Sequence, residues 1–287
     1  MKFKAVMTDQ LCMKDFLNIV ATFAKLSKRA IFNITTDGIV LSNIGATINT
    51  TPLLWAVVDK TDFFSAFAME GVDERNNEIW LNIYPEQIAT ALNTFKNFVK
   101  VIKIKLTKKQ FPCLSIDIEM APPNSNNFRR LVHDVPVTVI STREWNEYKV
   151  PDLQPFDISI QMPSLKSLRT LCDKMKNLSP TLTVVCSTNG DMSFIVETDS
   201  SMVVSRYFNL ALEENANHAS KHQSGSSEPE EFSCQIDTKQ LANVFSSMQM
   251  LSPKMVGNMV QDEILNIKIN IRENVVVFCN IHTVEAT

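Results

Sequence analysis

The residue types that could act in catalysis or bind a metal are few and scattered. Of the four histidines, only His218 and His222 have the i, i+4 spacing of two ligands on one face of a helix. They lie in a polar segment and lack the glutamate of an HExxH motif, so we interpret them as solvated side chains. The sequence therefore predicts no metal site.

Two pairs of acidic residues have the chemistry of general acid–base catalysis: Asp117 with Glu119, and Glu230 with Glu231. The first pair alternates with apolar residues and the second lies in a polar segment, so we interpret both pairs as solvated charge. The motifs GxxxxGKS/T, GxGxxG and GxSxG are absent, and the chain has only six glycines from which to build a phosphate-binding loop. We expect no cofactor and no enzymatic activity.

The six cysteines are far apart, contain no CxxC pair and mostly lie inside apolar runs. This distribution indicates reduced core thiols rather than a disulfide framework or a zinc site. They are Cys12, Cys113, Cys172, Cys186, Cys234 and Cys279. No apolar run approaches the roughly 18 to 20 residues of a membrane span, and the first ten residues alternate rather than forming a signal sequence. We expect a soluble intracellular protein without membrane association.

The remaining candidates are cations on the polar faces of amphipathic segments. Three belong to residues 13–28, and three share the polar side of residues 163–178 with Asp173; two more lie on two further predicted helices. They are Lys14, Lys25 and Lys28; Lys166, Arg169 and Lys176; and Lys96 and Lys239. Singly, each is an ordinary solubilising cation. If the four helices lie side by side, the cations form a basic surface that contacts phosphates without reading base sequence.

The net charge of −3 gives no support to general electrostatic attraction to nucleic acid. Any DNA-binding role must therefore depend on such local basic faces.

The clearest structural element is a hairpin over residues 103–119. Ile102, Ile104 and Leu106 alternate with polar residues before a turn that ends at Pro112, and apolar and polar residues alternate again after it. A hairpin cannot bury its apolar face alone, so it requires further strands and a layer of helix.

The rest of the chain supplies both, in two copies with the same order of elements. In the first half we expect helices over 13–28 and from Pro85, and strands at 2–8, 30–35, 39–43, 53–59, 63–69, 78–83 and 131–140. In the second half we expect helices over 163–178 and after Asp237 or Thr238, and strands at 156–162, 181–188, 192–198, 202–212, 232–236, 254–260, 264–272 and 275–282.

These elements predict an α+β fold with two similar domains, residues 1–140 and 156–287. Residues 141–155 contain Pro151 and Pro155, mix Trp145 and Tyr148 with charges, and are interpreted as a connector between the domains. The polar segment 213–231 is interpreted as a long loop.

Several runs of residues, in the same order along nearly the whole chain, resemble the Hus-one family of checkpoint sliding-clamp subunits, which is related to the proliferating-cell nuclear antigen. The runs are MKFKA at the start, MEGV at 69–72, NNEI at 76–79, KIKLTKKQFPCL at 103–114, HDVP at 133–136 and KMKN at 174–177. The resemblance implies the DNA-clamp fold: two similar domains, each with two helices packed on antiparallel sheets, in a ring of three subunits. In that ring the sheets would lie outside and the helices would line a hole around DNA.

By the same resemblance, the eight cations above would line or approach the hole. Edge strands on either side would pair with the neighbouring subunits through Leu131, His133, Val135 and Val137, and through Val203, Ser205, Tyr207 and Asn209. Pairing would satisfy backbone groups that otherwise form open edges. Trp145, Tyr148 and Pro151 would belong to the connector beside which partner peptides dock in clamps.

The function implied is a non-catalytic subunit of a heterotrimeric checkpoint clamp in the nucleus, with a cytoplasmic pool possible. Its expected partners are the Rad-nine-type and Rad-one-type clamp subunits, double-stranded DNA, an ATP-driven clamp loader, and repair and checkpoint proteins. Two alternatives stay open. One is a homotrimeric replication processivity clamp; the other is a small-molecule enzyme on an α+β scaffold, which would require a clustered polar pocket.

Overall fold

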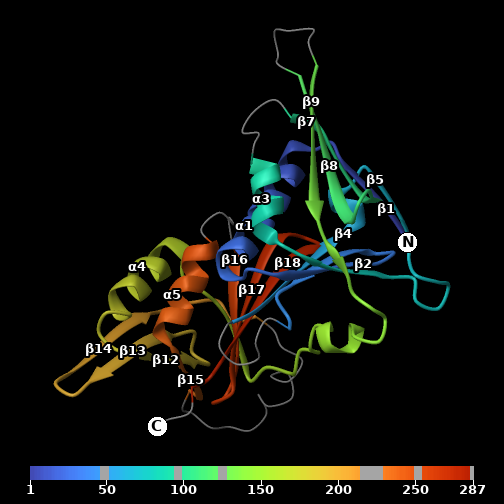
Figure 1. Cartoon of the computed structure of the whole chain (residues 1–287). Helices are drawn as coiled ribbons and strands as arrows, with labels where there is room; N and C mark the ends of the chain where they lie inside the picture. Colours follow the sequence, from blue (N-terminus) through green and yellow to red (C-terminus); the bar gives the residue numbers. More distant parts are fainter. Residues whose placement is uncertain (46–51, 94–98, 122–127, 214–228, 249–253, 285–287) are drawn as a thin grey trace. The chain divides into compact units, whose positions relative to one another are not determined.

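The structure is a computed structural model that describes residues 1–45, 52–93, 99–121, 128–213, 229–248 and 254–284 (Figure 1). Lys96, His218 and His222 lie outside these residues, as does most of the predicted loop 213–231.

The described chain forms two compact units. The first comprises the described residues up to Val150, apart from Pro52 and Leu53, together with Arg272–Val276. The second comprises Pro52 and Leu53, Pro151–Ile271 and the described residues from Val277 onward. The predicted connector is therefore divided at Val150, and five residues of the predicted C-terminal domain belong to the first unit.

Arg272–Val276 form the turn between the last two strands of the chain, and side-chain contacts join this turn to the rest of the first unit. Arg272 Nε donates to Asp15 Oδ2 at 2.8 Å, and Arg272 Nη1 donates to Cys12 Sγ at 3.4 Å. Asn274 Nδ2 donates to Asp62 Oδ2 at 2.9 Å. The guanidinium of Arg272 also lies 5.7 Å from the centroid of the Phe63 ring, within the range of a cation–π contact.

The first unit contains two groups of antiparallel strands and a helical layer. One sheet has the order β5-β1-β7-β8-β9, and the other strands are neighbours in the order β10-β6-β2-β3-β4. The strands are β1 (Lys2–Met7), β2 (Ala30–Ile34), β3 (Gly38–Ser42), β4 (Leu53–Asp59), β5 (Ala66–Glu70), β6 (Ile79–Ile83), β7 (Val99–Lys108), β8 (Pro112–Met120), β9 (Arg129–Pro136) and β10 (Thr138–Val139). Helices α1 (Gln10–Leu26) and α3 (Pro85–Asn93) pack against each other, and α2 (Lys60–Phe63) is a single turn.

The second unit repeats this plan. One sheet has the order β14-β13-β12-β15, and β18, β17, β16 and β11 are neighbours in that order. Its strands are β11 (Ile158–Gln161), β12 (Thr181–Ser187), β13 (Met192–Thr198), β14 (Ser201–Tyr207), β15 (Glu231–Asp237), β16 (Lys254–Val260), β17 (Ile264–Arg272) and β18 (Val275–His282). Helices α4 (Leu165–Met175) and α5 (Thr238–Ser247) pack side by side (Figure 1).

Side-chain caps fix where the helices begin. The Asp9 carboxylate caps α1 by accepting from the backbone N–H groups of Leu11 and Cys12. Ser164 caps α4 by accepting from Ser167 N, and Asp237 caps α5 by accepting from Gln240 N. These caps satisfy donors that a helix N-terminus leaves without an intrahelical partner.

The predicted hairpin is confirmed as β7–β8. Ile104 pairs with Ile116 and Leu106 with Leu114, so their apolar side chains share one face of the sheet. Ile102, Ile104, Leu114, Ile116 and Ile118 are all buried. All six cysteines are buried and free, as the sequence predicts.

Burial makes the thiols poor nucleophiles. It raises the pKa of Cys172 and of Cys186 to about 12, because a thiolate would lose its hydration there. Both thiols are therefore neutral at physiological pH and serve as core residues.

Three predicted element boundaries are wrong. The strand expected at 63–69 begins only at Ala66, because Asp59 caps the short helix α2 and Phe63 is buried within it. The strand expected at 131–140 is split into β9 and β10, which lie in different sheets. The strand expected at 202–212 ends at Tyr207, after which Asn209 adopts a positive φ of 56°, Leu210 N donates to Gly190 O, and residues 211–213 pair with β11.

Candidate nucleic-acid interface and open sheet edges

Helix α1 presents two of the predicted cations on one stripe. Lys14 and Lys25 are exposed and lie eleven positions apart, about 16 Å along the helix axis. Lys28 is exposed but lies beyond the helix, which ends at the C-cap Ser27. Asn18, four positions after Lys14, is only 4% exposed and therefore does not extend this stripe.

Helix α4 carries its cations on two stripes rather than on the single side that the sequence suggests. Lys166 and Lys174 are exposed, whereas Arg169 and Lys176 are partly buried. At about 100° per residue, Thr170 and Lys174 lie roughly 40° and 80° from Lys166 on one side, whereas Arg169 and Lys176 lie roughly 60° and 80° from it on the other side. Leu165, Leu168, Cys172 and Met175 form the buried side, whereas Leu171 is only partly buried.

The two stripes of α4 also differ in their charge partners. Lys176 Nζ lies 2.7 Å from Asp173 Oδ1, so this cation is partly neutralised. Lys166 and Lys174 form no ion pair with any residue that the structure describes. Sequence reasoning missed Lys174, although its i, i+4, i+8 spacing with Lys166 and Thr170 is a signal for a shared stripe.

Helix α5 contributes Lys239, which is exposed in the first helical turn. A cation at this end of a helix is opposed by the helix dipole, so it does not stabilise the helix that carries it. Its position is better suited to an external anion. Lys96 follows α3 and lies outside the described residues.

Strand β9 is an end strand of its sheet, with β8 as its neighbour. Its register pairs His133 with Ile116 and Leu131 with Ile118, so both side chains lie on the face that covers the core. Val135 and Val137 are 4% and 7% exposed, and Val137 lies beyond β9 with its N–H donating to Pro112 O. The side chains of Leu131 and His133 can therefore contact a neighbouring subunit, whereas those of Val135 and Val137 are packed within the first unit.

The outer face of this sheet holds an ion pair that overturns one sequence interpretation. Asp117 is 4% exposed rather than solvated. Two donors of the Arg130 guanidinium, Nε and Nη2, hydrogen-bond to the Asp117 carboxylate, and Nε lies 2.7 Å from Oδ1. Hydrogen bonds from Arg130 lower the pKa of Asp117, because they stabilise the ionised carboxylate.

Strand β14 is likewise an end strand, with β13 as its neighbour. Ser205 pairs with buried Phe194, and the Tyr207 ring packs edge-on against Phe194 with centroids 6.0 Å apart. The Tyr207 hydroxyl lies 2.9 Å from Ser167 Oγ of α4. Met202, Val203 and Val204 are 58%, 39% and 38% exposed, which leaves apolar surface along this edge.

The comparisons with known proteins decide the family. The family described as Hus1-like protein matches residues 1–285. The chain belongs to the Hus1-like family. A Checkpoint protein Hus1-like from Drosophila melanogaster is 30% identical over 278 residues, covering 96% of each chain. Checkpoint protein HUS1 from Homo sapiens is 30% identical over 269 residues, covering 93% of this chain and 94% of the relative.

Solved structures show that this Hus1-like chain has the sliding-clamp fold. Proliferating cellular nuclear antigen from Entamoeba histolytica and PCNA from Thermococcus kodakaraensis each superpose with a TM-score of 0.70 at 15% identity. Each comparison covers 98% of this chain, and covers 98% and 100% of the two antigens. The predicted family and fold class are confirmed.

In this Hus1-like chain the aromatic residues of the predicted connector pack onto the first unit. Trp145 is 8% exposed and stacks on Trp80, with ring centroids 5.7 Å apart. Tyr148 packs against the same cluster and lies so close to Gly45 that a Cβ there would meet its ring at 2.4 Å. Of the three predicted connector residues, only Pro151 is exposed.

No helix among the described residues is long and apolar enough to cross a membrane. The same residues contain no cluster of three or more His, Cys, Asp or Glu side chains arranged to hold a metal ion.

Proposed function

We propose that the chain is a non-catalytic subunit of a heterotrimeric checkpoint clamp that encircles double-stranded DNA. Its neighbours are the Rad-nine-type and Rad-one-type clamp subunits. An ATP-driven loader places the ring at damaged DNA in the nucleus, where it recruits checkpoint and repair proteins. The Hus1-like family match and the clamp fold support this assignment.

The observation that carries the proposal is the pair of end strands, one in each unit. Among the described residues, β9 and β14 each terminate a sheet whose other end strand is β5 or β15, and each leaves one side without a strand neighbour. Open edges of this kind are prone to pair with another chain, and ring closure would satisfy both. The exposed apolar side chains of β14 fit such an interface.

The DNA-facing surface in this proposal consists of the cations on the helices. We assign it to Lys14, Lys25, Lys28, Arg169, Lys176 and Lys239, with Lys96 assigned by family resemblance alone. Contacts between these cations and phosphates carry no base-sequence information, so in this proposal the ring holds DNA without reading its sequence and slides.

A homotrimeric replication clamp is the runner-up, because it has the same fold. It is not favoured, since the named relatives that match this sequence are checkpoint proteins.

Light scattering separates the two assemblies. The mass of the purified chain alone is compared with its mass after co-expression with the other two checkpoint clamp subunits. We expect a monomer that enters a 1:1:1 complex. A stable homotrimer would support the replication clamp instead, and a chain that joins neither assembly would contradict the proposed function.

A further inference from the structure

A groove of about 430 Å³ lies between α4 and the end strand β14. Every lining residue except Leu171 carries a polar group, although most of the lining surface is apolar: Lys166 and Lys174 contribute ammonium groups, and Ser164, Ser167, Thr170 and Tyr207 contribute hydroxyls. No carboxylate is among the lining residues. The groove therefore presents positive charge.

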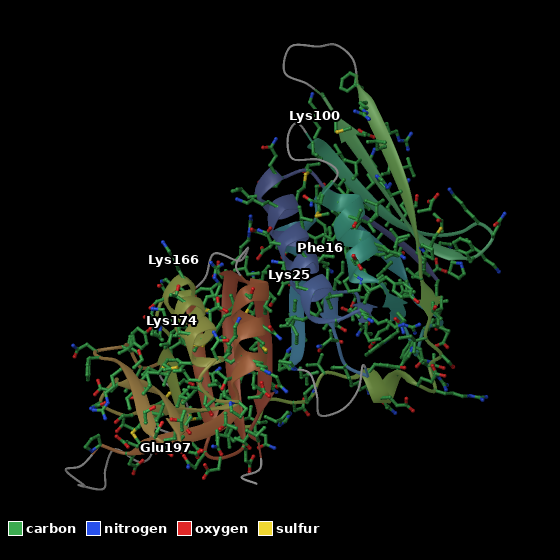
Figure 2. The ribbon with its side chains drawn as sticks, turned by 60° about the vertical axis from the view of Figure 1, so that its left-hand side comes forward. Phe16, Lys25, Lys100, Lys166, Lys174 and Glu197 are labelled. Carbon is green, nitrogen blue, oxygen red and sulfur yellow. The ribbon has the colours of Figure 1, made fainter. Side chains whose placement is uncertain are left out.

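The two lysines are available for an external anion. Lys166 and Lys174 are exposed, project from α4 and form no ion pair with the residues described here (Figure 2). They lie eight residues apart, about 12 Å along the helix. A ligand that carries one or two negative charges along an extended segment would match this spacing.

The wall of the groove is part of the open sheet edge. Tyr207 belongs to β14 and is held against α4 by its 2.9 Å contact with Ser167. Val203, Ser205 and Tyr207 lie on the same face of the strand because side chains alternate. A strand added to β14 would therefore direct its own side chains on this face toward the groove.

The other end strand of the proposed ring contacts, β9 of the first unit, shows what chemistry a clamp edge can present. A second groove, also of about 430 Å³, lies between α3 and β9 and is lined by Glu86, Asp134, His133 and neighbouring residues. Lys109 already neutralises Asp134, whereas Glu86 is exposed and forms no ion pair with a described residue. Carboxylates at the strand of a neighbouring subunit that is equivalent to β9 would be attracted to the lysines beside β14.

We propose that the α4–β14 groove accepts carboxylate side chains of the subunit that pairs with β14, so that Lys166 and Lys174 select this neighbour. The inference rests on the proposed ring. It assigns Lys166 to the subunit interface rather than to DNA, because the groove it lines is built partly from the edge strand. Arg169 and Lys176, on the other stripe of α4, remain assigned to DNA.

The test reverses the charge of the groove and measures assembly with each of the other two clamp subunits in turn. Lys166→Glu combined with Lys174→Glu should weaken association with one neighbour by about tenfold or more, since like charges at an interface are strongly unfavourable. Association with the other neighbour should not change. The neutral pair Lys166→Gln and Lys174→Gln should have a smaller effect in the same direction.

The matched control is Lys4→Glu combined with Lys254→Glu, which changes the net charge equally at two exposed lysines away from the groove. Circular dichroism checks that every variant is folded. If the groove variant binds both neighbours like the control, the inference is wrong and the proposed function stands. Normal assembly with reduced DNA retention would instead identify a phosphate site.

The remaining candidate occupant of the α4–β14 groove is a second copy of this chain. If the wild-type chain self-associates and both Glu86→Lys and the groove variant abolish this, the groove binds another copy and not a different subunit. If the wild-type chain joins neither clamp subunit, the proposed function itself fails.

Discussion

At the scale of single residues, alternation in the sequence predicts the face on which Asp117 lies but not its burial. Alternation correctly places it on the outer face of β8, opposite Val132. It is nevertheless buried, because Arg130 reaches it diagonally from β9. The register of β8 against β9 depends on residues more than ten positions apart, and no local pattern contains it.

The Asp117–Arg130 pair predicts a specific dependence of stability on pH. The folded-state pKa of Asp117 is lowered, so its contribution is fully present above the unfolded-state value of about 4. The contribution is lost as the pH falls through the folded-state pKa. Asp117→Asn should therefore lower the free energy of unfolding by about 1 kcal/mol at pH 7, after allowing for the solvent exposure of Arg130.

Urea unfolding at pH 7 and at pH 3 measures this difference, with Asp152→Asn as the control at an exposed carboxylate. The gap between wild type and Asp117→Asn should narrow at pH 3. A gap of the same size at both pH values would show that the ionised pair is not its cause.

At the scale of elements, the sequence predicts those helices and strands whose signals are local. Side-chain caps and apolar spacing locate α1, α4 and α5, and alternation locates the β7–β8 hairpin. The short helix α2 was missed because one turn has no period to detect. Helical spacing alone separates Lys166 and Lys174 from Lys176, but the contact between Tyr207 of β14 and Ser167 of α4 is visible only in the structure.

The open edge of β14 predicts an effect of a single charge. Val203→Lys should weaken association with one neighbouring subunit by about tenfold, because it places an unpaired charge in an apolar contact. Val57→Lys is a matched control, since Val57 is 40% exposed and Val203 is 39% exposed. Sedimentation with each neighbour measures both variants. Equal behaviour of the two variants would contradict a role of β14 in assembly.

At the scale of the whole molecule, the cationic helix faces predict how DNA retention responds to salt. Combining Lys14→Gln, Lys25→Gln and Lys239→Gln should reduce the slope of log retention against log salt by up to about 0.9 for each phosphate that a lysine no longer neutralises. Retention of the assembled, loaded ring is measured over a range of salt concentrations on linear DNA with free ends, where the ring is not held by topology alone. An unchanged slope would remove these three lysines from the DNA surface.

The duplicated plan is the feature that the sequence predicts best, because each half repeats the order of elements even though its residues differ. The amphipathic spacing of the helices predicts the list of cations, and family resemblance contributes the edge strands and the position of the cations around DNA. The sequence did not indicate that Trp145 and Tyr148 pack onto the first unit, since their contacts with Trp80 and Gly45 connect segments far apart in the chain.

The turn at Arg272–Val276 has a consequence for any attempt to study the halves separately. A fragment that ends at Val150 would lack the guanidinium that binds Asp15 and Cys12 and lies over Phe63. It would also lack the Asn274 amide that binds Asp62. The N-terminal repeat is therefore not self-sufficient: a cut in the connector removes part of its own structure, and only a fragment supplied with the β17–β18 hairpin in trans would recover it.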